Sequence, residues 1–342
     1  MNRILALAMI AIFLLLHPIH AQDASLSAIY SGWPITNMWW SADSRVFAFQ
    51  GNMTSAPESS WYAYDVTSGR LTNSQTWPLQ PTLNRIEQQA LDSQETLGVE
   101  VNLVFSSPNG QFLVGSSENL TGLQNQSSYV SQATISNRTT NTINLIGLPI
   151  ITQTSVDRYR VQWSDDSSTF VVSTSAVQVS ALSFFYYVTG YAESNATDIV
   201  AVDMQPVMID GQNHSILEVF DLSNDGRQVL LFASRSGSGR PDYCLIRWSS
   251  IESSSHVLVP GFDGITEYHP SAVFSSEGSD IVLIFQRSGI NEVNLISGNV
   301  RNLYPDLGSE RFTNAMFSPD GRYIALVERV TDAVFSVYVV AL

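Results

Sequence analysis

The hydrophobic pattern of this chain consists of short apolar runs, each of which follows a recurring polar turn. The clearest run is Tyr323-Ile324-Ala325-Leu326-Val327, which comes directly after Phe317-Ser318-Pro319-Asp320-Gly321-Arg322. Similar apolar runs lie at 229–232 and 281–284. Short apolar runs bounded by turn residues are typical of strands that are buried on both faces. The pattern therefore predicts an all-β chain whose sheets have neighbours on both sides.

The polar turn occurs six times along the chain. The other copies lie at 40–45, 107–111, 163–167, 222–227 and 274–278. Asp and Asn bond to the local backbone and Gly tolerates a positive φ, so the phrase suits a tight turn between two strands. Two copies depart from it, because Ser44 and Ser167 occupy the usual glycine position.

The spacing of the copies predicts the architecture. Their serines lie 66, 57, 59, 52 and 43 residues apart, and each interval can hold about four strands, as a β-propeller blade of roughly 40–50 residues does. Further strands are expected at 61–66, 243–248, 292–296 and 334–340, with hairpin turns at 67–69 and 297–298. We therefore predict an all-β, six-bladed β-propeller of four-stranded antiparallel blades, with seven blades as the alternative.

The two ends of the chain are expected to share one blade. The last unit ends at Leu342 after its third strand, so the missing outer strand should come from the N-terminal region near 25–31. Such pairing closes the ring and removes an open sheet edge. The longest interval also contains Ile86, Ala90 and Leu91 at helical spacing, which predicts a short surface helix within 82–96.

The N-terminus has the pattern of a secretory signal. Arg3 precedes an apolar run at 4–16, and Ala21 lies just before Gln22. Thirteen apolar residues are fewer than the roughly 20 that a helix needs to span a bilayer, so an uncleaved anchor is the alternative. We predict a signal peptide at 1–21, cleavage near Ala21, a single domain at 22–342 without a transmembrane segment, and a secreted or periplasmic location.

Composition narrows the chemistry. The net charge of −15 makes nucleic acid and anionic membranes unfavourable partners. The chain has no lysine, which excludes Schiff-base lysines and Walker-type phosphate loops. Cys244 is the single cysteine, so an intramolecular disulfide is excluded, and we expect a buried inert thiol.

No catalytic, metal or cofactor site is predicted. A Gly-x-Ser-x-Gly elbow is absent, and the three histidines after residue 21 lie far apart in the sequence. The acids of the turns share one repeat position: Asp43, Asp166, Asp225, Glu277 and Asp320. Because each acid belongs to a separate hairpin, we expect them to lie far apart and to serve the turns.

A binding site is expected on the disc face opposite the turns, where loops of the six units differ. The candidates, mostly arginines of units four to six, are Arg235, Arg240, Glu267, His269, Arg287, Arg311 and Arg329. Such an arginine cluster suits an anionic or carboxylate-bearing partner. The alternative is that arginines locked to the repeat brace hairpins or pair with neighbouring acids. Trp33 is a candidate exposed aromatic residue.

The segment 317–325 closely resembles the repeat of TolB-like, WD-repeat-like β-propellers, and so do 235–237, 287–289 and 269–275. The resemblance covers nearly the whole chain after residue 21 and is closest in units four to six. TolB-like proteins are periplasmic and carry an additional N-terminal α/β domain, for which this sequence has no room. The same repeat occurs in prolyl oligopeptidase-like enzymes, whose hydrolase domain is missing here.

The function predicted from these observations is binding. We expect a monomeric, non-enzymatic binding or scaffolding module that recognises a protein or an envelope or extracellular polymer through one disc face. The alternative is a propeller-type hydrolase or lyase with its active site on loops at the channel mouth, because a fold by itself does not specify a function.

Overall fold

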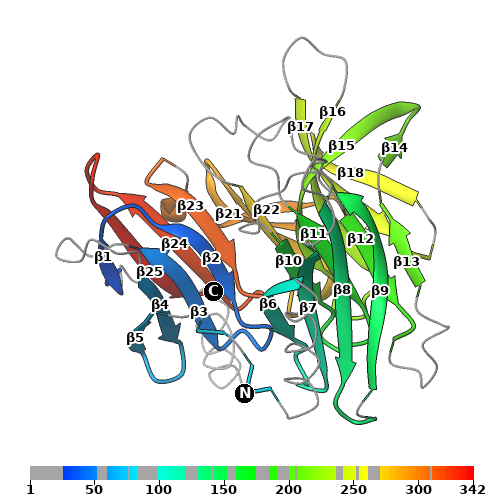
Figure 1. Cartoon of the computed structure of the whole chain (residues 1–342). Helices are drawn as coiled ribbons and strands as arrows, with labels where there is room; N and C mark the ends of the chain where they lie inside the picture. The colour runs from blue at the N-terminus through cyan, green and yellow to red at the C-terminus, as the bar shows by residue number, and fades with distance from the viewer. Residues whose placement is uncertain are drawn as a thin grey trace, which may run out of the picture.

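The described part of the chain is built almost entirely of β-strands, which form six antiparallel sheets (Figure 1). The computed structural model describes residues 26–51, 60–75, 78–79, 81–83, 99–119, 129–140, 142–151, 159–174, 185–191, 200–204, 207–235, 242–251, 254–260, 270–308 and 310–342. Within these residues the helical element is η3 (Pro305–Leu307), a short 3-10 helix. The all-β prediction is confirmed, whereas the predicted signal peptide and nearly all of the predicted helix at 82–96 lie outside the described residues.

The first three sheets follow the chain in order, each a meander of four strands. Sheet 1 consists of β2 (Thr36–Trp40), β3 (Val46–Gly51), β4 (Ser60–Asp65) and β5 (Arg70–Ser74). Sheet 2 consists of β6 (Val99–Ser106), β7 (Phe112–Asn119), β8 (Tyr129–Asn137) and β9 (Thr142–Ile151). Sheet 3 consists of β10 (Tyr159–Trp163), β11 (Phe170–Thr174), β12 (Phe185–Thr189) and β13 (Val200–Asp203).

The other three sheets include one with an additional strand. Sheet 4 consists of β14 (Val207–Ile209), β15 (Gln212–Leu222), β16 (Gln228–Arg235), β17 (Asp242–Ser249) and β18 (Ser254–Pro260). Sheet 5 consists of β19 (Ser271–Ser275), β20 (Gly278–Gln286), β21 (Gly289–Asn294) and β22 (Val300–Tyr304). Sheet 6 consists of β23 (Phe312–Phe317), β24 (Tyr323–Arg329), β25 (Phe335–Ala341) and β1 (Tyr30–Gly32).

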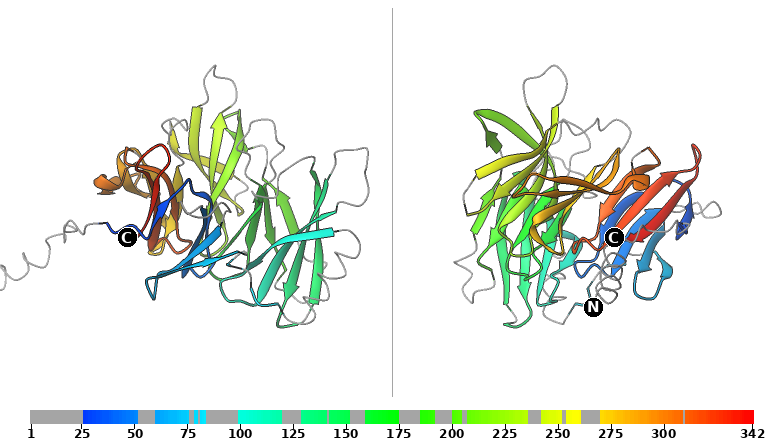
Figure 2. Two further views of the ribbon diagram at one scale, coloured as in Figure 1. Left: turned by 60° about the vertical axis from the view of Figure 1, so that its left-hand side comes forward. Right: turned by 180° about the vertical axis from the view of Figure 1, so that it is seen from behind.

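The extra strand β14 was not foreseen from the sequence. It pairs with the first residues of β15 through a hairpin in which Asp210 and Gly211 both have positive φ, the conformation of a two-residue type I′ turn. Figures 1 and 2 show this hairpin extending beyond the ends of the neighbouring strands. Sheet 4 therefore has five strands where four were predicted, because the sequence ahead of the repeated phrase contains a second Asp-Gly turn.

The N-terminal segment supplies the outer strand of the last sheet. Strand β1 runs antiparallel to β25, with Tyr30 opposite Val337 and Gly32 opposite Phe335. The ring of Tyr30 also packs against Phe49 and Tyr62 of sheet 1, and burial raises its pKa to about 12. The three residues of β1 therefore join the two ends of the chain in one sheet and contact the next sheet as well.

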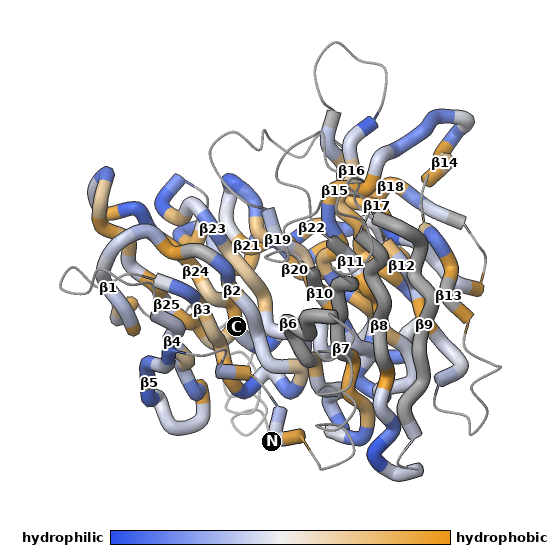
Figure 3. Tube along the Cα trace, in the orientation of Figure 1, coloured by the Kyte–Doolittle hydropathy of each residue, from blue (hydrophilic) through white to orange (hydrophobic). Residues whose placement is uncertain are grey.

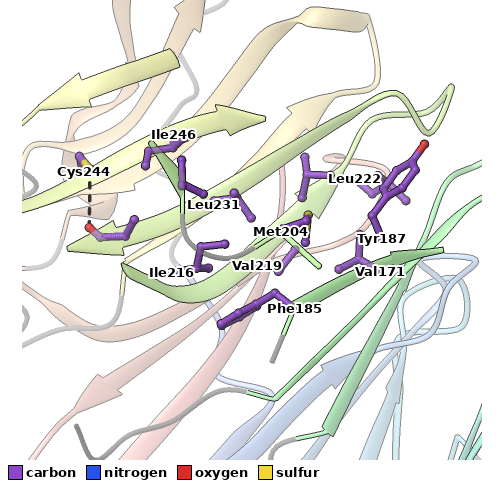
Figure 4. Close-up of a cluster of buried hydrophobic side chains, with 13 residues drawn as sticks. Val171, Phe185, Tyr187, Met204, Ile216, Val219, Leu222, Leu231, Cys244 and Ile246 are labelled. Carbon is purple, nitrogen blue, oxygen red and sulfur yellow. Dashed lines mark hydrogen bonds between the residues drawn. The ribbon is translucent and has the colours of Figure 1, made fainter. Parts of the chain in front are cut away.

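The core lies between neighbouring sheets. Buried clusters join sheets 2 and 3, 3 and 4, 4 and 5, 5 and 6, and 6 and 1. In the cluster of Figure 4, Val171 and Phe185 of sheet 3 pack against Ile216 and Leu231 of sheet 4. Figure 3 shows apolar residues concentrated along the strands and hydrophilic residues at the hairpin tips. The runs that are apolar on both faces thus belong to sheets packed on both sides.

Candidate binding channel

Five of the six repeated turns share one hydrogen-bond pattern. In the last copy, the Ser318 hydroxyl donates to Asp320 Oδ1 at 2.6 Å and accepts the backbone N–H of Tyr323 at 3.0 Å. Equivalent contacts link Ser to Asp or Asn in the turns that begin at Ser41, Ser107, Ser164 and Ser223. The acids of these turns are therefore used to close the turns, as the sequence predicted.

The copy at 274–278 forms a different turn. Ser275 pairs directly with Gly278, and the backbone N–H of Glu277 donates to the Ser275 hydroxyl at 3.2 Å. A register shift between Phe274 and Ser275 leaves a two-residue turn at Ser276 and Glu277 in this hairpin. Treating Glu277 as equivalent to the turn aspartates was therefore wrong for this hairpin.

The two serines at the glycine position connect neighbouring sheets. Ser44 and Ser167 both have a φ of 58°, a left-handed conformation that side chains rarely adopt. The Ser44 hydroxyl accepts the backbone N–H of Asp320 at 3.0 Å, and the Ser167 hydroxyl accepts that of Asn109 at 3.3 Å. The two departures from the repeat therefore have a structural role. Ser44 joins the turns of sheets 1 and 6, and Ser167 joins the turns of sheets 3 and 2.

A cavity of about 1070 Å³ lies among the first strands of the sheets, and residues of all six sheets line it. Its wall includes Trp40, Phe105 and Trp163 from sheets 1 to 3 and Phe220, Ala272 and Phe317 from sheets 4 to 6. We call this cavity the channel. Sheets that surround a central channel with their first strands have the architecture of a β-propeller.

The ionisable groups that line the channel are acidic. They are Asp43, Glu218 and Asp221, and no lysine, arginine or histidine is among the described lining residues. Asp221 is 7% exposed, and its Oδ2 accepts the backbone N–H of Phe274 at 2.7 Å. Burial raises the pKa of Asp221 well above its ordinary value. This carboxyl group therefore joins sheets 4 and 5 and places a proton-binding group in the wall.

A further acid lies where the turns converge. Asp165 takes the place in its turn that Pro319 has in the last copy, and its pKa is raised by burial and by repulsion from Asp320 and Asp166. Since Asp320 belongs to sheet 6 and Asp165 to sheet 3, turns of non-adjacent sheets lie within electrostatic reach of one another. The sequence analysis expected the turn acids to lie far apart and did not single out Asp165. Nothing in the sequence near these residues indicates that turns of different sheets approach one another.

The predicted arginines lie at the opposite strand ends, where three of them form ion pairs. The pairs join Arg287 to Glu310 at 3.4 Å, Arg311 to Glu328 at 3.0 Å and Arg329 to Asp332 at 2.7 Å. Arg235 ends β16 opposite His214 of β15. The remaining candidates, Arg240, Glu267 and His269, lie outside the described residues.

Glu328 is the best-connected of these partners. Burial alone would raise its pKa, but hydrogen bonds from Arg311 and Tyr338 hold the pKa below its ordinary value. The Tyr338 hydroxyl donates to Glu328 at 2.5 Å, and the Arg311 guanidinium lies over the rings of Phe312 and Tyr338. The contacts match the bracing alternative for Arg311, since this arginine stabilises the junction of β23, β24 and β25.

The described part of the chain lacks two features. No group of three or more His, Cys, Asp or Glu residues is arranged to hold a metal ion among the residues that the structure describes. The same residues include no helix with the length and apolar character needed to cross a bilayer.

Comparisons with known proteins find structural similarity but no sequence relatives. No protein-family model and no curated protein matches this sequence. TolB from Acinetobacter baumannii is 14% identical with a TM-score of 0.44, over 81% of this chain and 55% of the TolB chain. An oligogalacturonate lyase in complex with manganese is 11% identical with a TM-score of 0.46, over 91% and 77% of the two chains.

A third similar structure is the β-propeller domain of the Trilobed protease from Pyrococcus furiosus. It is 8% identical with a TM-score of 0.45, over 91% of this chain and 84% of that chain. The matched part thus spans about half of the TolB chain and most of the other two chains. At these values the similarity carries no conclusion about activity or ligand, which have to be argued from the channel.

Proposed function

We propose that this protein is a secreted or periplasmic six-bladed β-propeller, closed by β1 and β25, that acts as a monomeric, non-enzymatic binding module. Its partner is a protein or a cell-surface polymer that docks on one disc face and inserts a segment into the channel. In this proposal the leader at 1–21 is removed near Ala21. Arg235, Arg287, Arg311 and Arg329 lie at the rim of the face opposite the repeated turns.

The channel is the observation that carries the proposal. Its volume of about 1070 Å³ is slightly larger than the roughly 300–1,000 Å³ of a typical small-molecule site. The wall combines aromatic rings with many polar side chains, among them Asn37, Gln162 and Asn314, so a ligand could find both apolar contact and hydrogen-bond partners there. The strands that carry these side chains are packed on both sides, since lining residues such as Val219 and Ala272 also belong to the buried clusters between the sheets.

Blocking the channel tests the proposal. Asn314 is half-buried in β23 and lines the channel, so Asn314→Trp should fill it, whereas Asn73→Trp places the same ring on the exposed edge strand β5. A partner captured reproducibly from an envelope extract by wild type and Asn73→Trp, but not by Asn314→Trp, is expected. Equal capture by all three folded proteins would show that the channel is not used.

Among the described residues, the buried Asp221 is the observation that favours an enzyme. A carboxyl group with a raised pKa in a cavity is a candidate general acid. Its hydrogen bond to the Phe274 backbone gives it a structural role instead. Turnover of a polysaccharide or peptide library that Asp221→Asn abolishes while the melting temperature is kept would replace binding with hydrolase or lyase chemistry.

A further inference from the structure

Two buried polar atoms in the channel wall have no hydrogen-bond partner among the described residues. Trp163 lines the channel and is 6% exposed, and its Nε1–H has no acceptor. The neighbouring Gln162 amide is held in place, because its Nε2 donates to the backbone oxygens of Val219 at 3.0 Å and Phe220 at 2.9 Å. Its Oε1 remains an acceptor without a donor. Consecutive residues of β10 therefore carry an unused donor and an unused acceptor.

A hydroxyl group suits both atoms, because its oxygen accepts a hydrogen bond and its O–H donates one. A carboxylate only accepts, and an ammonium group only donates. Either charged group would leave one of the two atoms unpaired, and a buried polar atom without a partner costs free energy. The described lining also contains no lysine, arginine or histidine, so an anion would find no counter-charge there. The two atoms therefore favour an uncharged ligand that carries hydroxyl groups.

Uncharged polar residues line another side of the channel. Asn37 and Asn314 lie four residues ahead of the repeated serine in sheets 1 and 6, and Ser271 has the same place in sheet 5. Buried clusters join sheet 5 to sheet 6 and sheet 6 to sheet 1. The two amides and the hydroxyl therefore belong to three neighbouring sheets and occur at one level of the repeat.

Irregular strand pairing lies beside both asparagines. The pairing of β2 with β3 shifts register around Asn37, and that of β23 with β24 shifts just ahead of Asn314. Asn37 has a φ of 53°, a left-handed conformation that side chains rarely adopt, and its Nδ2 donates to Gln50 Oε1 at 2.9 Å. A β-bulge changes the direction of the side chains beside it, and in both strands the residue beside the irregularity lines the channel.

Aromatic rings favour a sugar over a peptide as the source of the hydroxyl groups. Trp40, Phe105 and Phe220 are half-buried residues of the lining, from sheets 1, 2 and 4. A sugar ring has apolar C–H faces and hydroxyl groups around its edge, so it packs on an aromatic ring while its hydroxyls reach amides. A peptide has hydroxyl groups only at serine, threonine and tyrosine, whereas every residue of a neutral polysaccharide carries several.

We propose that the channel binds an uncharged sugar residue of a polysaccharide. This inference rests on the proposed function and names the cell-surface polymer as the partner. Trp163 and Gln162 exchange hydrogen bonds with hydroxyl groups on one side of the sugar, and Asn37 and Asn314 do so on another. The faces of the sugar ring pack against the aromatic residues of the lining.

A panel of oligosaccharides tests the ligand class. The neutral members are maltohexaose, cellohexaose, mannohexaose and chitohexaose, and the charged member is the hexasaccharide of mannuronic acid, which differs from mannohexaose in its carboxylates. The peptide probe is acetylated and amidated Gly-Ser-Asn-Ser-Gly. In isothermal titration of the mature protein, at least one neutral member should bind at least about tenfold more tightly than the charged member and the peptide. Its binding should also change the tryptophan emission, because Trp40 and Trp163 line the channel.

Two variants locate the binding, with the melting temperature as the check that each is folded. Trp163→Phe keeps an aromatic ring in the cluster of sheets 2 and 3 and removes the N–H, so the affinity for the sugar should fall about threefold to tenfold. Asn314→Leu removes a polar group of similar size and should lower the affinity by a similar factor. The control is Asn73→Leu on the exposed edge strand β5, which should leave the affinity unchanged.

Each other outcome overturns the proposal or part of it. Tighter binding of the charged hexasaccharide than of every neutral one would refute the uncharged ligand. Binding of the peptide without any sugar would replace the polysaccharide with a protein segment. Sugar binding that is unaffected by both Trp163→Phe and Asn314→Leu would place the site outside the channel. No binding of any probe would refute the inference, while the capture experiment with Asn314→Trp decides the proposed function separately.

Discussion

Ser44 allows a direct test of how the repeated turns hold neighbouring sheets together. Its side chain is 4% exposed, its φ is 58°, and its hydroxyl accepts the backbone N–H of Asp320 at 3.0 Å. Two replacements separate these features. Ser44→Ala removes the acceptor and keeps the backbone strain, whereas Ser44→Gly removes the acceptor and relieves the strain.

The expected magnitudes follow from these contacts. Ser44→Ala leaves a part-buried N–H without its partner, which costs about 1–3 kcal/mol. A left-handed conformation costs a residue with a side chain about 1 kcal/mol relative to glycine, so Ser44→Gly should recover about that amount. We therefore expect Ser44→Ala to lower the free energy of unfolding by about 1 kcal/mol more than Ser44→Gly.

Two glycines at the same turn position provide controls. At Gly110 an added Cβ meets nothing within 4 Å, so Gly110→Ala should measure the cost of a positive φ alone. At Gly226 an added Cβ would lie 2.7 Å from Thr169 Oγ1, and overpacking adds about 1–3 kcal/mol. The expected order of destabilisation is Gly226→Ala above Gly110→Ala.

The assay is urea unfolding of the mature chain, followed by tryptophan fluorescence and far-ultraviolet circular dichroism in parallel. Coincident transitions by the two probes would justify a two-state free energy. The hydrogen bond between sheets would be refuted if Ser44→Ala were as stable as wild type. The account of strain would be refuted if Ser44→Gly were as destabilised as Ser44→Ala.

Three further changes test other parts of the structure. Tyr30→Ala should lower the free energy of unfolding by about 3–5 kcal/mol, because Tyr30 is 4% exposed and belongs to the cluster between sheets 6 and 1. The control is Trp33→Ala. Trp33 is 46% exposed, so its loss should shift the melting temperature by less than about 1 °C. Asp221→Asn keeps an acceptor for the backbone N–H of Phe274 and removes a carboxyl group whose ionisation is disfavoured by burial. That ionisation costs the folded wild type stability at high pH. The gain in melting temperature over wild type should therefore be larger at about pH 8 than at about pH 4. Arg311→Ala should cost less than about 1 kcal/mol at neutral pH because the Arg311 side chain is 46% exposed and Glu328 keeps its hydrogen bond from Tyr338. Because the pKa of Glu328 is lowered in the folded protein, wild type should lose stability as the pH falls below about 4.3 and Glu328 takes up a proton. Arg311→Ala should make this loss smaller. An unchanged dependence of stability on pH in acid would contradict this role of Arg311.

Much of the fold could be predicted because its signals are local. The apolar runs became β16, β20 and β24, and five copies of the repeated phrase became nearly identical turns. These features depend on residues within a few positions of one another. Their strand and turn propensities, and the hydrogen bonds from side chain to backbone, are largely independent of the rest of the chain. The copy with Glu277 differed, since its hairpin closes between Ser275 and Gly278 after a register shift.

The candidate site could not be predicted in the same way. Sequence reasoning chose arginines of the face opposite the turns, and Arg287, Arg311 and Arg329 are found in ion pairs with nearby acids. It passed over Glu218, Asp221 and Asp165, which no local pattern distinguishes from other acids. Their surroundings come from the packing of the sheets: Glu218 and Asp221 line the channel, and Asp165 lies within electrostatic reach of Asp320 from another sheet.

The strands, the turns and their repetition follow from the sequence alone, because they arise from short-range periodicity and turn chemistry. Which groups meet in space depends on how the sheets pack. Packing of apolar faces brings the first strands of six sheets around one channel, and it aligns the Ser44 hydroxyl with the Asp320 backbone, 276 residues away in the chain. Such contacts depend on the positions of whole sheets, and the burial that raises the pKa of Asp221 exists only after the sheets have packed.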